Sequence, residues 1–125
     1  MKMKKILILA LFTYSISAHF ICKDYYLYTN GVQGYLTGFE SNEDCLKAVK
    51  NSQSGFICKN HYLYSVGQKK YRTSFSSHIE CIDAVKKAKN GFICQGTYLF
   101  SINTSEFLTS YESEKKCQSA IKSSM

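Results

Sequence analysis

The sequence lacks the short motifs by which many enzyme active sites are found. It has no glycine-rich phosphate-binding loop, no Cys-x-x-Cys motif and no pair of carboxylates at a suggestive spacing. Serines recur at Ser41, Ser77 and Ser113, but no histidine or acidic residue recurs beside them to act as a base. We therefore predict a protein that is not an enzyme and that has no cofactor and no metal site.

Long apolar runs are also lacking. The run at residues 6–12 has seven apolar residues, whereas a membrane-spanning helix needs about 20. Lysines precede this run and small residues follow it, which is the pattern of an export signal. We predict a signal peptide over residues 1–18 that is cleaved near Ser17 or Ala18. The mature protein is expected to be secreted or periplasmic, without a membrane span.

What the chain does have is six cysteines on a regular lattice. They form two sets whose members are 36 residues apart: Cys22, Cys58 and Cys94, and Cys45, Cys81 and Cys117. Each cysteine of the first set precedes one of the second set by 23 residues. One unit is therefore written three times, and we place the repeats at residues 19–54, 55–90 and 91–125. Because such short units seldom fold alone, we expect them to form one compact domain.

Each repeat has the pattern of two strands followed by a helix. In the middle repeat, residues 56–64 are rich in aromatic and β-branched residues, and residues 71–75 alternate with a period of two. Ser77 then precedes Glu80 as in a helix-starting capping box, and an apolar stripe follows at Cys81, Ala84 and Val85. We predict an α+β fold of three tandem β-β-α repeats. The antiparallel hairpins should pair into one sheet, with the helices packed on one face.

The cysteine positions predict one disulfide in each repeat. An even number of cysteines behind a signal peptide favours disulfides in an oxidising compartment. The pairing that repeats identically in every unit is Cys22–Cys45, Cys58–Cys81 and Cys94–Cys117. The alternative that stays open joins neighbouring repeats through Cys45–Cys58 and Cys81–Cys94, and leaves Cys22 with Cys117.

A second row of apolar residues alternates with the cysteine side of the predicted sheet. In the middle repeat it contains Ile57 and Leu63, which we expect to point away from the helix. The same row contains Ile21, Leu27, Leu36, Ile93, Leu99 and Leu108. Unless the sheet curls or a partner covers it, this row is exposed and marks an interaction surface.

The positive charge is concentrated in the middle repeat. That repeat holds six lysines and Arg72 against Glu80 and Asp83, a net charge of +5, while the first carries −1 and the third is neutral. The candidate anion-binding residues are Lys59, Lys69, Lys70, Tyr71 and Arg72. The alternative interpretation is that this run is only a solvated turn. A tyrosine between basic residues can stack on sugar rings, so an anionic polymer is a candidate ligand.

One alternative interpretation is a copper site at His19. Cleavage after Ala18 would make it the amino-terminal residue, and a terminal amine with an imidazole can bind copper. No second ligand is positioned by the sequence.

Two families share local features with the repeats. The step Phe75-x-Ser77-x-x-x-Cys81 resembles the strand-to-helix step of sporulation-related peptidoglycan-binding repeats, and the β-β-α order is similar to small YegP-like repeats. No functional residues are transferred from either family.

We therefore predict an exported, disulfide-stapled, non-catalytic binding or interaction protein. It would contact an anionic envelope polymer or a protein partner through the basic middle repeat, and nucleic acid is not an expected partner. The alternative is a secreted inhibitor or effector that acts on an enzyme through the variable loops at residues 29–34, 65–70 and 101–106, where the repeats diverge most. The sequence does not predict the oligomeric state.

Overall fold

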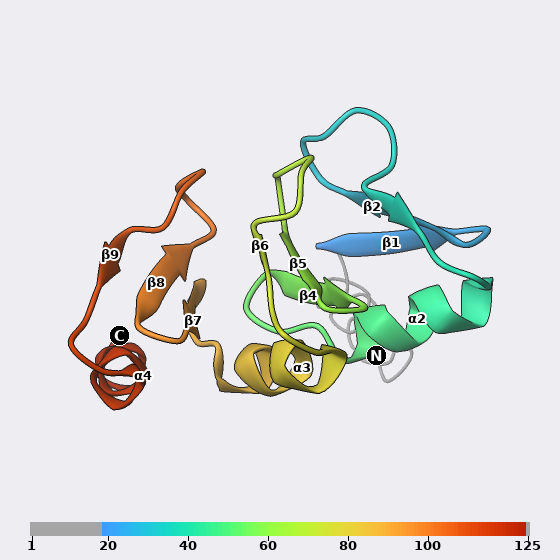
Figure 1. Cartoon of the computed structure of the whole chain (residues 1–125). Coiled ribbons are helices and arrows are strands. Elements are labelled where there is room, and N and C mark those ends of the chain that lie inside the picture. Colours follow the sequence, from blue (N-terminus) through green and yellow to red (C-terminus); the bar gives the residue numbers. More distant parts are fainter. Residues whose placement is uncertain (1–18, 125) are drawn as a thin grey trace, which may run out of the picture.

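The computed structural model describes residues 19–124, and the predicted signal peptide at residues 1–18 lies outside this range. Three similar units stand side by side, each with its strands above a helix in the view of Figure 1. The first contains β1 (Phe20–Lys23), β2 (Tyr26–Thr29), β3 (Thr37–Gly38) and α2 (Asn42–Lys50). The second contains β4 (Phe56–Lys59), β5 (Tyr62–Ser65), β6 (Thr73–Ser74) and α3 (His78–Lys87). The third contains β7 (Phe92–Gln95), β8 (Tyr98–Ser101), β9 (Thr109–Ser110) and α4 (Glu114–Lys122). The α+β class and the three tandem repeats are confirmed.

The first predicted strand of each repeat is itself a tight hairpin, so the unit is β-β-β-α. In the middle repeat, β4 pairs with β5 so that Lys59 faces Tyr62 and Cys58 faces Leu63. The two-residue turn between them begins at Asn60, whose φ is +57°. Asp24 and Gly96 hold the equivalent positions with φ of +52° and +57°, and Asp, Asn and Gly tolerate this backbone region better than other residues.

The hairpin changes which residues share a face. Directly paired residues of antiparallel strands point to the same side, so Leu63 lies on the same face as Cys58 and not with Ile57. Leu63 and its equivalent Leu27 are fully buried on the helix side. The prediction that Leu27, Leu63 and Leu99 point away from the helix together with the isoleucines was therefore wrong, whereas Leu36 does lie with Ile57.

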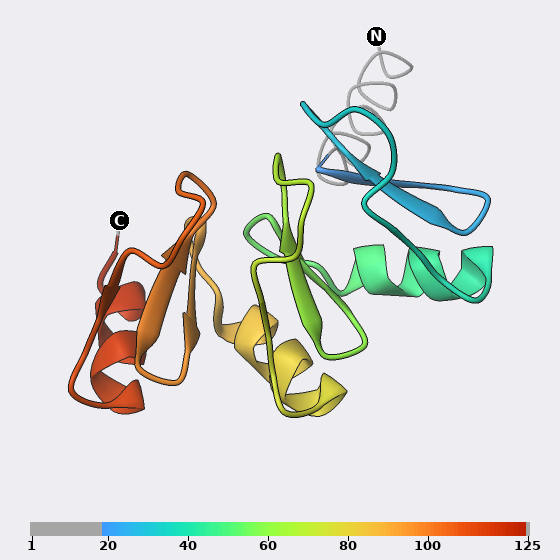
Figure 2. The same cartoon turned by 45° about the horizontal axis from the view of Figure 1, so that its top comes forward.

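The strands form three separate sheets and not one. Each sheet is three-stranded and antiparallel, in the orders β1-β2-β3, β4-β5-β6 and β7-β8-β9. The expectation that the hairpins pair into a common sheet was wrong because the third strand of each repeat, only two residues long, ends the sheet. Each helix packs on one face of its own sheet, as predicted. Figure 2 shows the three sheet-and-helix units as distinct blocks.

One disulfide staples each sheet to its helix. Cys22–Cys45, Cys58–Cys81 and Cys94–Cys117 are bonded, with Cα–Cα distances of 6.0, 6.1 and 6.2 Å. The predicted pairing is confirmed, and the alternative between neighbouring repeats is excluded. Three disulfides in a chain of this size fit a small, stabilised protein of the extracellular type.

The recurring serines begin the helices. Ser41, Ser77 and Ser113 are extended N-cap residues, and each hydroxyl accepts a hydrogen bond from the backbone N–H three residues later. This satisfies a donor that the first helical turn would otherwise leave without a partner.

The back of each sheet packs on the repeat before it. Ile57 and Ile93 are both fully buried although they point away from their own helices. Ile57 lies in the core cluster of the first repeat with Leu36, and Ile93 lies in that of the second repeat. Stacking of the repeats therefore covers Leu36, Ile57 and Ile93, while Ile21 and Leu108 stay about half exposed. Among residues 19–124, no helix is long and apolar enough to cross a membrane.

Candidate functional site

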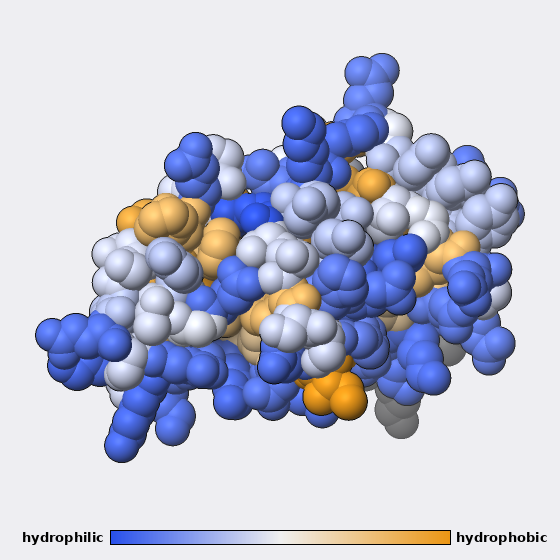
Figure 3. Space-filling view, in the orientation of Figure 1, coloured by the Kyte–Doolittle hydropathy of each residue, from blue (hydrophilic) through white to orange (hydrophobic). Residues whose placement is uncertain are grey.

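The predicted anion-binding residues do not all lie together. Lys69, Lys70 and Tyr71 belong to the loop at residues 66–71 that joins β5 to β6. Lys59 ends β4 beside the hairpin turn, at the opposite end of β5. Equivalent loops at residues 30–35 and 102–107 lie on the same side of the molecule, and we call the three together the loop edge (Figure 1). Figure 3 shows hydrophilic side chains projecting from the top of the molecule, where these loops lie.

Lys69 joins the loop of the second repeat to that of the first. Its ammonium group donates a hydrogen bond to the carbonyl oxygen of Gln33, at 3.0 Å. The same nitrogen lies 6.0 Å from the centre of the Tyr35 ring, at the outer limit of a cation–π contact. A second link lies below it, where the backbone N–H of Gly67 donates to the Thr29 hydroxyl at 3.2 Å. The two loops are thus held as one surface.

The Arg72 side chain makes its contacts within the protein and is not free to bind a ligand. Its guanidinium donates to the Ser65 hydroxyl at 2.9 Å and to the carbonyl oxygen of Thr104 in the third repeat. It also lies 5.8 Å from the centre of the Phe100 ring. Burial lowers the pKa of Arg72 from its ordinary value, and its Nε is buried without a hydrogen-bond partner. Arg72 therefore ties the second repeat to the third.

The other two basic residues of the loop keep their charge available. Lys70 is exposed, and neither Lys69 nor Lys70 has a carboxylate oxygen within 4.0 Å among the residues the structure describes. The ion pairs found in this part of the chain, Lys87–Asp83 and Lys116–Glu112, both lie along the helix side. The loop edge is therefore positive at its centre, while Glu106 in the third loop is its only acidic residue.

A pair of aromatic rings recurs beside each loop, and the sequence analysis missed it. Ring centres lie 4.5 Å apart for Tyr26 and Tyr35, 4.7 Å for Tyr62 and Tyr71, and 4.9 Å for Tyr98 and Phe107. The loop member of each pair is half exposed, at 47%, 50% and 49% for Tyr35, Tyr71 and Phe107. A signal was present, because aromatic residues recur at both positions in all three repeats.

The first tyrosine pair has an additional neighbour. A side-chain hydrogen bond with Tyr25 raises the pKa of Tyr26 above its ordinary value. Tyr26 is therefore neutral at physiological pH, and the Tyr35 ring beside it offers an aromatic face to the Lys69 ammonium. Together we call Gln33, Tyr35, Lys69, Lys70 and Tyr71 the basic loop site.

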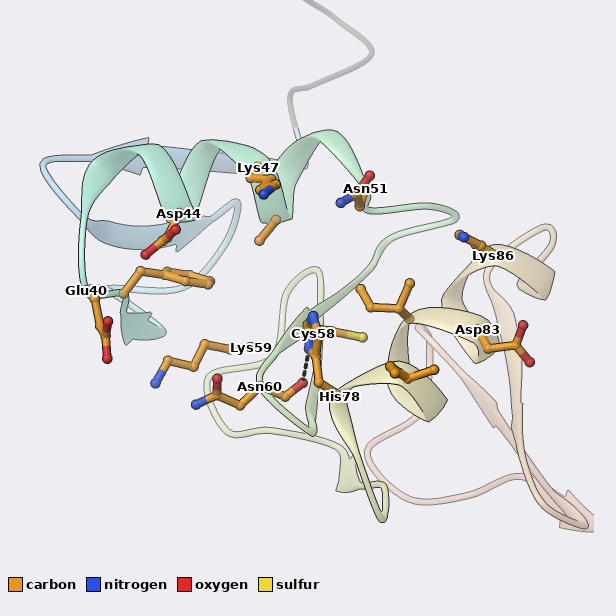
Figure 4. A pocket seen from close by; sticks show the side chains of 14 residues that line it. Glu40, Asp44, Lys47, Asn51, Cys58, Lys59, Asn60, His78, Asp83 and Lys86 are labelled. Atoms are coloured by element: carbon orange, nitrogen blue, oxygen red, sulfur yellow. Dashed lines mark hydrogen bonds between the residues drawn. The ribbon is translucent and has the colours of Figure 1, made fainter.

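Lys59 lines a different feature, a cavity of about 690 Å³ between the first and second repeats. Figure 4 shows Asp44 and Lys47 on α2 at one side of it and Lys59 near the middle. His78 donates a hydrogen bond from Nδ1 to the Asn60 carbonyl oxygen, 2.7 Å away. Acidic residues also line this cavity, so its charge is mixed. Lys59 therefore does not belong to the basic loop site.

The histidines do not assemble a metal site. His61 stacks on Tyr62 with ring centres 4.2 Å apart, and His19 is exposed at the start of the described chain. No group of three or more His, Cys, Asp or Glu side chains placed to hold a metal occurs within residues 19–124. The copper hypothesis for His19 gains no second ligand from the structure.

Comparison of the chain with protein-family models, with curated proteins and with solved structures finds no match. The local resemblances of the strand-to-helix step are therefore not supported by a family match.

Proposed function

We propose that this is an exported, non-catalytic protein that binds an anionic polymer of the cell envelope at the basic loop site. The observation that carries the proposal is the position of Lys69. It bridges two repeats, lies above the Tyr35 ring and has no carboxylate partner among residues 19–124. The exposed Lys70 and the half-exposed Tyr71 lie in the same loop.

The chemistry of the site suits charged sugars better than simple anions. Aromatic faces give stacking surfaces for ring-shaped groups, while lysines are flexible point charges that bind carboxylate, sulfate or phosphate groups. A single exposed charge contact contributes only about 0.2–1 kcal/mol and is screened by salt. Useful affinity therefore requires many charged groups on one ligand, which a polymer supplies by raising the effective concentration.

The predicted export signal and the disulfides support the proposed location. Disulfides form and persist in the periplasm and outside the cell, where envelope polymers are found. No catalytic step is proposed, because the groups at the site are two lysines, two tyrosines and an amide, without a neighbouring general base.

The test is retention on an anionic polymer in a salt gradient. Immobilised polygalacturonate and dextran sulfate serve as probes, and uncharged dextran serves as the control matrix. Lys69→Glu with Lys70→Glu should elute at much lower salt than the unmodified protein. Lys115→Glu with Lys122→Glu changes the net charge equally at exposed positions on α4, away from the site, and should keep most of the retention.

Tyr71→Ser separates sugar binding from simple charge. It leaves every charge in place, so it should weaken binding to polygalacturonate and leave retention on an inorganic cation exchanger unchanged. Equal elution of the Lys69/Lys70 variant and the Lys115/Lys122 variant would show that the basic loop site is not the binding site.

The second candidate is a secreted inhibitor or effector that inserts its loops into an enzyme. It is favoured by the position of the three variable loops on one edge, with the first two hydrogen-bonded to each other. Such a complex would be less sensitive to salt than polymer binding. Replacement of residues 67–70 by the sequence of residues 31–34 should abolish inhibition of the target while the fold is kept, because Ser65 and Val66 stay in place.

A further inference from the structure

The contact between neighbouring repeats is formed twice with the same positions. Ile57 and Ile93, at 0% exposure, enter the core of the repeat before them. An aromatic residue and an aliphatic residue accompany each isoleucine. These companions are Tyr64 and Val66 in the first contact and Phe100 and Ile102 in the second. One face of each repeat is thus built to dock on the preceding repeat.

The first repeat carries that docking face with nothing described before it. Ile21 holds the position of Ile57 and is 49% exposed. Tyr28 holds the position of Tyr64 and is partly exposed. Asn30 stands where Val66 and Ile102 stand, so this face keeps two of the three apolar groups.

The third repeat carries the receiving face with nothing described after it. Leu36 is 9% exposed beneath the second repeat, and its equivalent Leu108 is 50% exposed. Phe56 is fully buried, whereas its equivalent Phe92 is partly exposed. Both side chains are more exposed than their equivalents, at the face where the structure describes no following repeat.

We propose that the exported protein associates head to tail with further copies of itself, the first repeat of one copy docking on the third repeat of another. Both halves of an interface that the chain already forms twice are present at its two ends, which makes a second copy the fitting occupant. The contact is heterologous, so it forms open chains or rings and not symmetric dimers. It is weaker than the internal contacts because Asn30 replaces an aliphatic side chain. The proposal does not depend on polymer binding, since neither Ile21 nor Leu108 belongs to the basic loop site.

The test is sedimentation velocity of the disulfide-bonded exported protein at concentrations up to about 1 mM, where even a weak interface is partly occupied. The unmodified protein should form species that grow beyond the dimer as concentration rises. Ile21→Asp and Leu108→Asp should each be monomeric alone, because each lacks one face. An equal mixture of the two retains one intact pair of faces and should form a dimer that grows no further.

Ile79→Asp is the matched control, because Ile79 is 78% exposed and lies on α3 away from both end faces. This variant should associate like the unmodified protein. A monomeric unmodified protein at the highest concentration would overturn the proposal. So would self-association of Leu108→Asp alone, which would indicate a symmetric contact between first repeats, or equal loss of association in Ile79→Asp, which would indicate non-specific adhesion.

Discussion

Truncation of equivalent isoleucines tests the stacking of the repeats. Ile57→Ala removes a side chain that is fully buried between the first two repeats, and such truncations cost about 2–5 kcal/mol of unfolding free energy. Ile93→Ala should cost a similar amount between the second and third repeats. Ile21→Ala makes the same change at a side chain that is 49% exposed, so it should cost about 1 kcal/mol or less.

The assay is guanidinium unfolding of the oxidised protein at low concentration, followed by circular dichroism and by tyrosine fluorescence, since the chain has no tryptophan. The slope of the unfolding free energy against denaturant must be compared among the variants, because repeat proteins can lose cooperativity when a contact between repeats is weakened. The free energies are directly comparable where this slope is unchanged. Equal losses of unfolding free energy for Ile21→Ala and Ile57→Ala would refute the stacking. The two residues hold the same position of the repeat, but only Ile57 is covered by a preceding repeat.

Two further predictions concern the staples and the repeat boundary. Replacement of Cys58 and Cys81 together by alanine opens one loop and should lower the unfolding free energy by about 3 kcal/mol, measured by the same unfolding assay; an unchanged midpoint would contradict a staple between sheet and helix. Gly91→Ala should destabilise the protein more than Gly67→Ala, which can be measured as a difference in thermal midpoint. Both glycines have φ near +80°, but an added Cβ at Gly91 would lie 3.1 Å from Ile102, whereas at Gly67 it would meet nothing within 4 Å.

The covalent framework and the repeat order could be predicted from the sequence, because both follow from spacing. A pairing that repeats identically in three units limits the disulfides, and a serine three residues before an acid marks where two of the helices begin. The hairpin within the first predicted strand was missed although its signal was present. Asp24, Asn60 and Gly96 occupy one position of the repeat, and all three residue types accept the positive φ of a tight turn.

The burial of Ile57 and Ile93 could not be predicted in this way. It depends on how one repeat sits on the next, and periodicity within a unit carries no information on that arrangement. The candidate site could be predicted only in part, because its contacts also depend on how one repeat sits on the next. The charge run located Lys69, Lys70 and Tyr71 in one loop, but only the structure shows that Lys69 reaches Gln33 and that Arg72 is directed to Thr104.

The most direct test of the proposed function is to map the polymer on the protein by amide chemical shifts. Isotope-labelled oxidised protein would be titrated with short polygalacturonate chains at low salt, with neutral dextran fragments as the control. Binding at the basic loop site predicts shift changes concentrated in residues 30–35 and 66–71, with the helices α2, α3 and α4 unaffected. Changes centred on the cavity beside Lys59 or on the helices, or no change with the acidic oligomer, would contradict it.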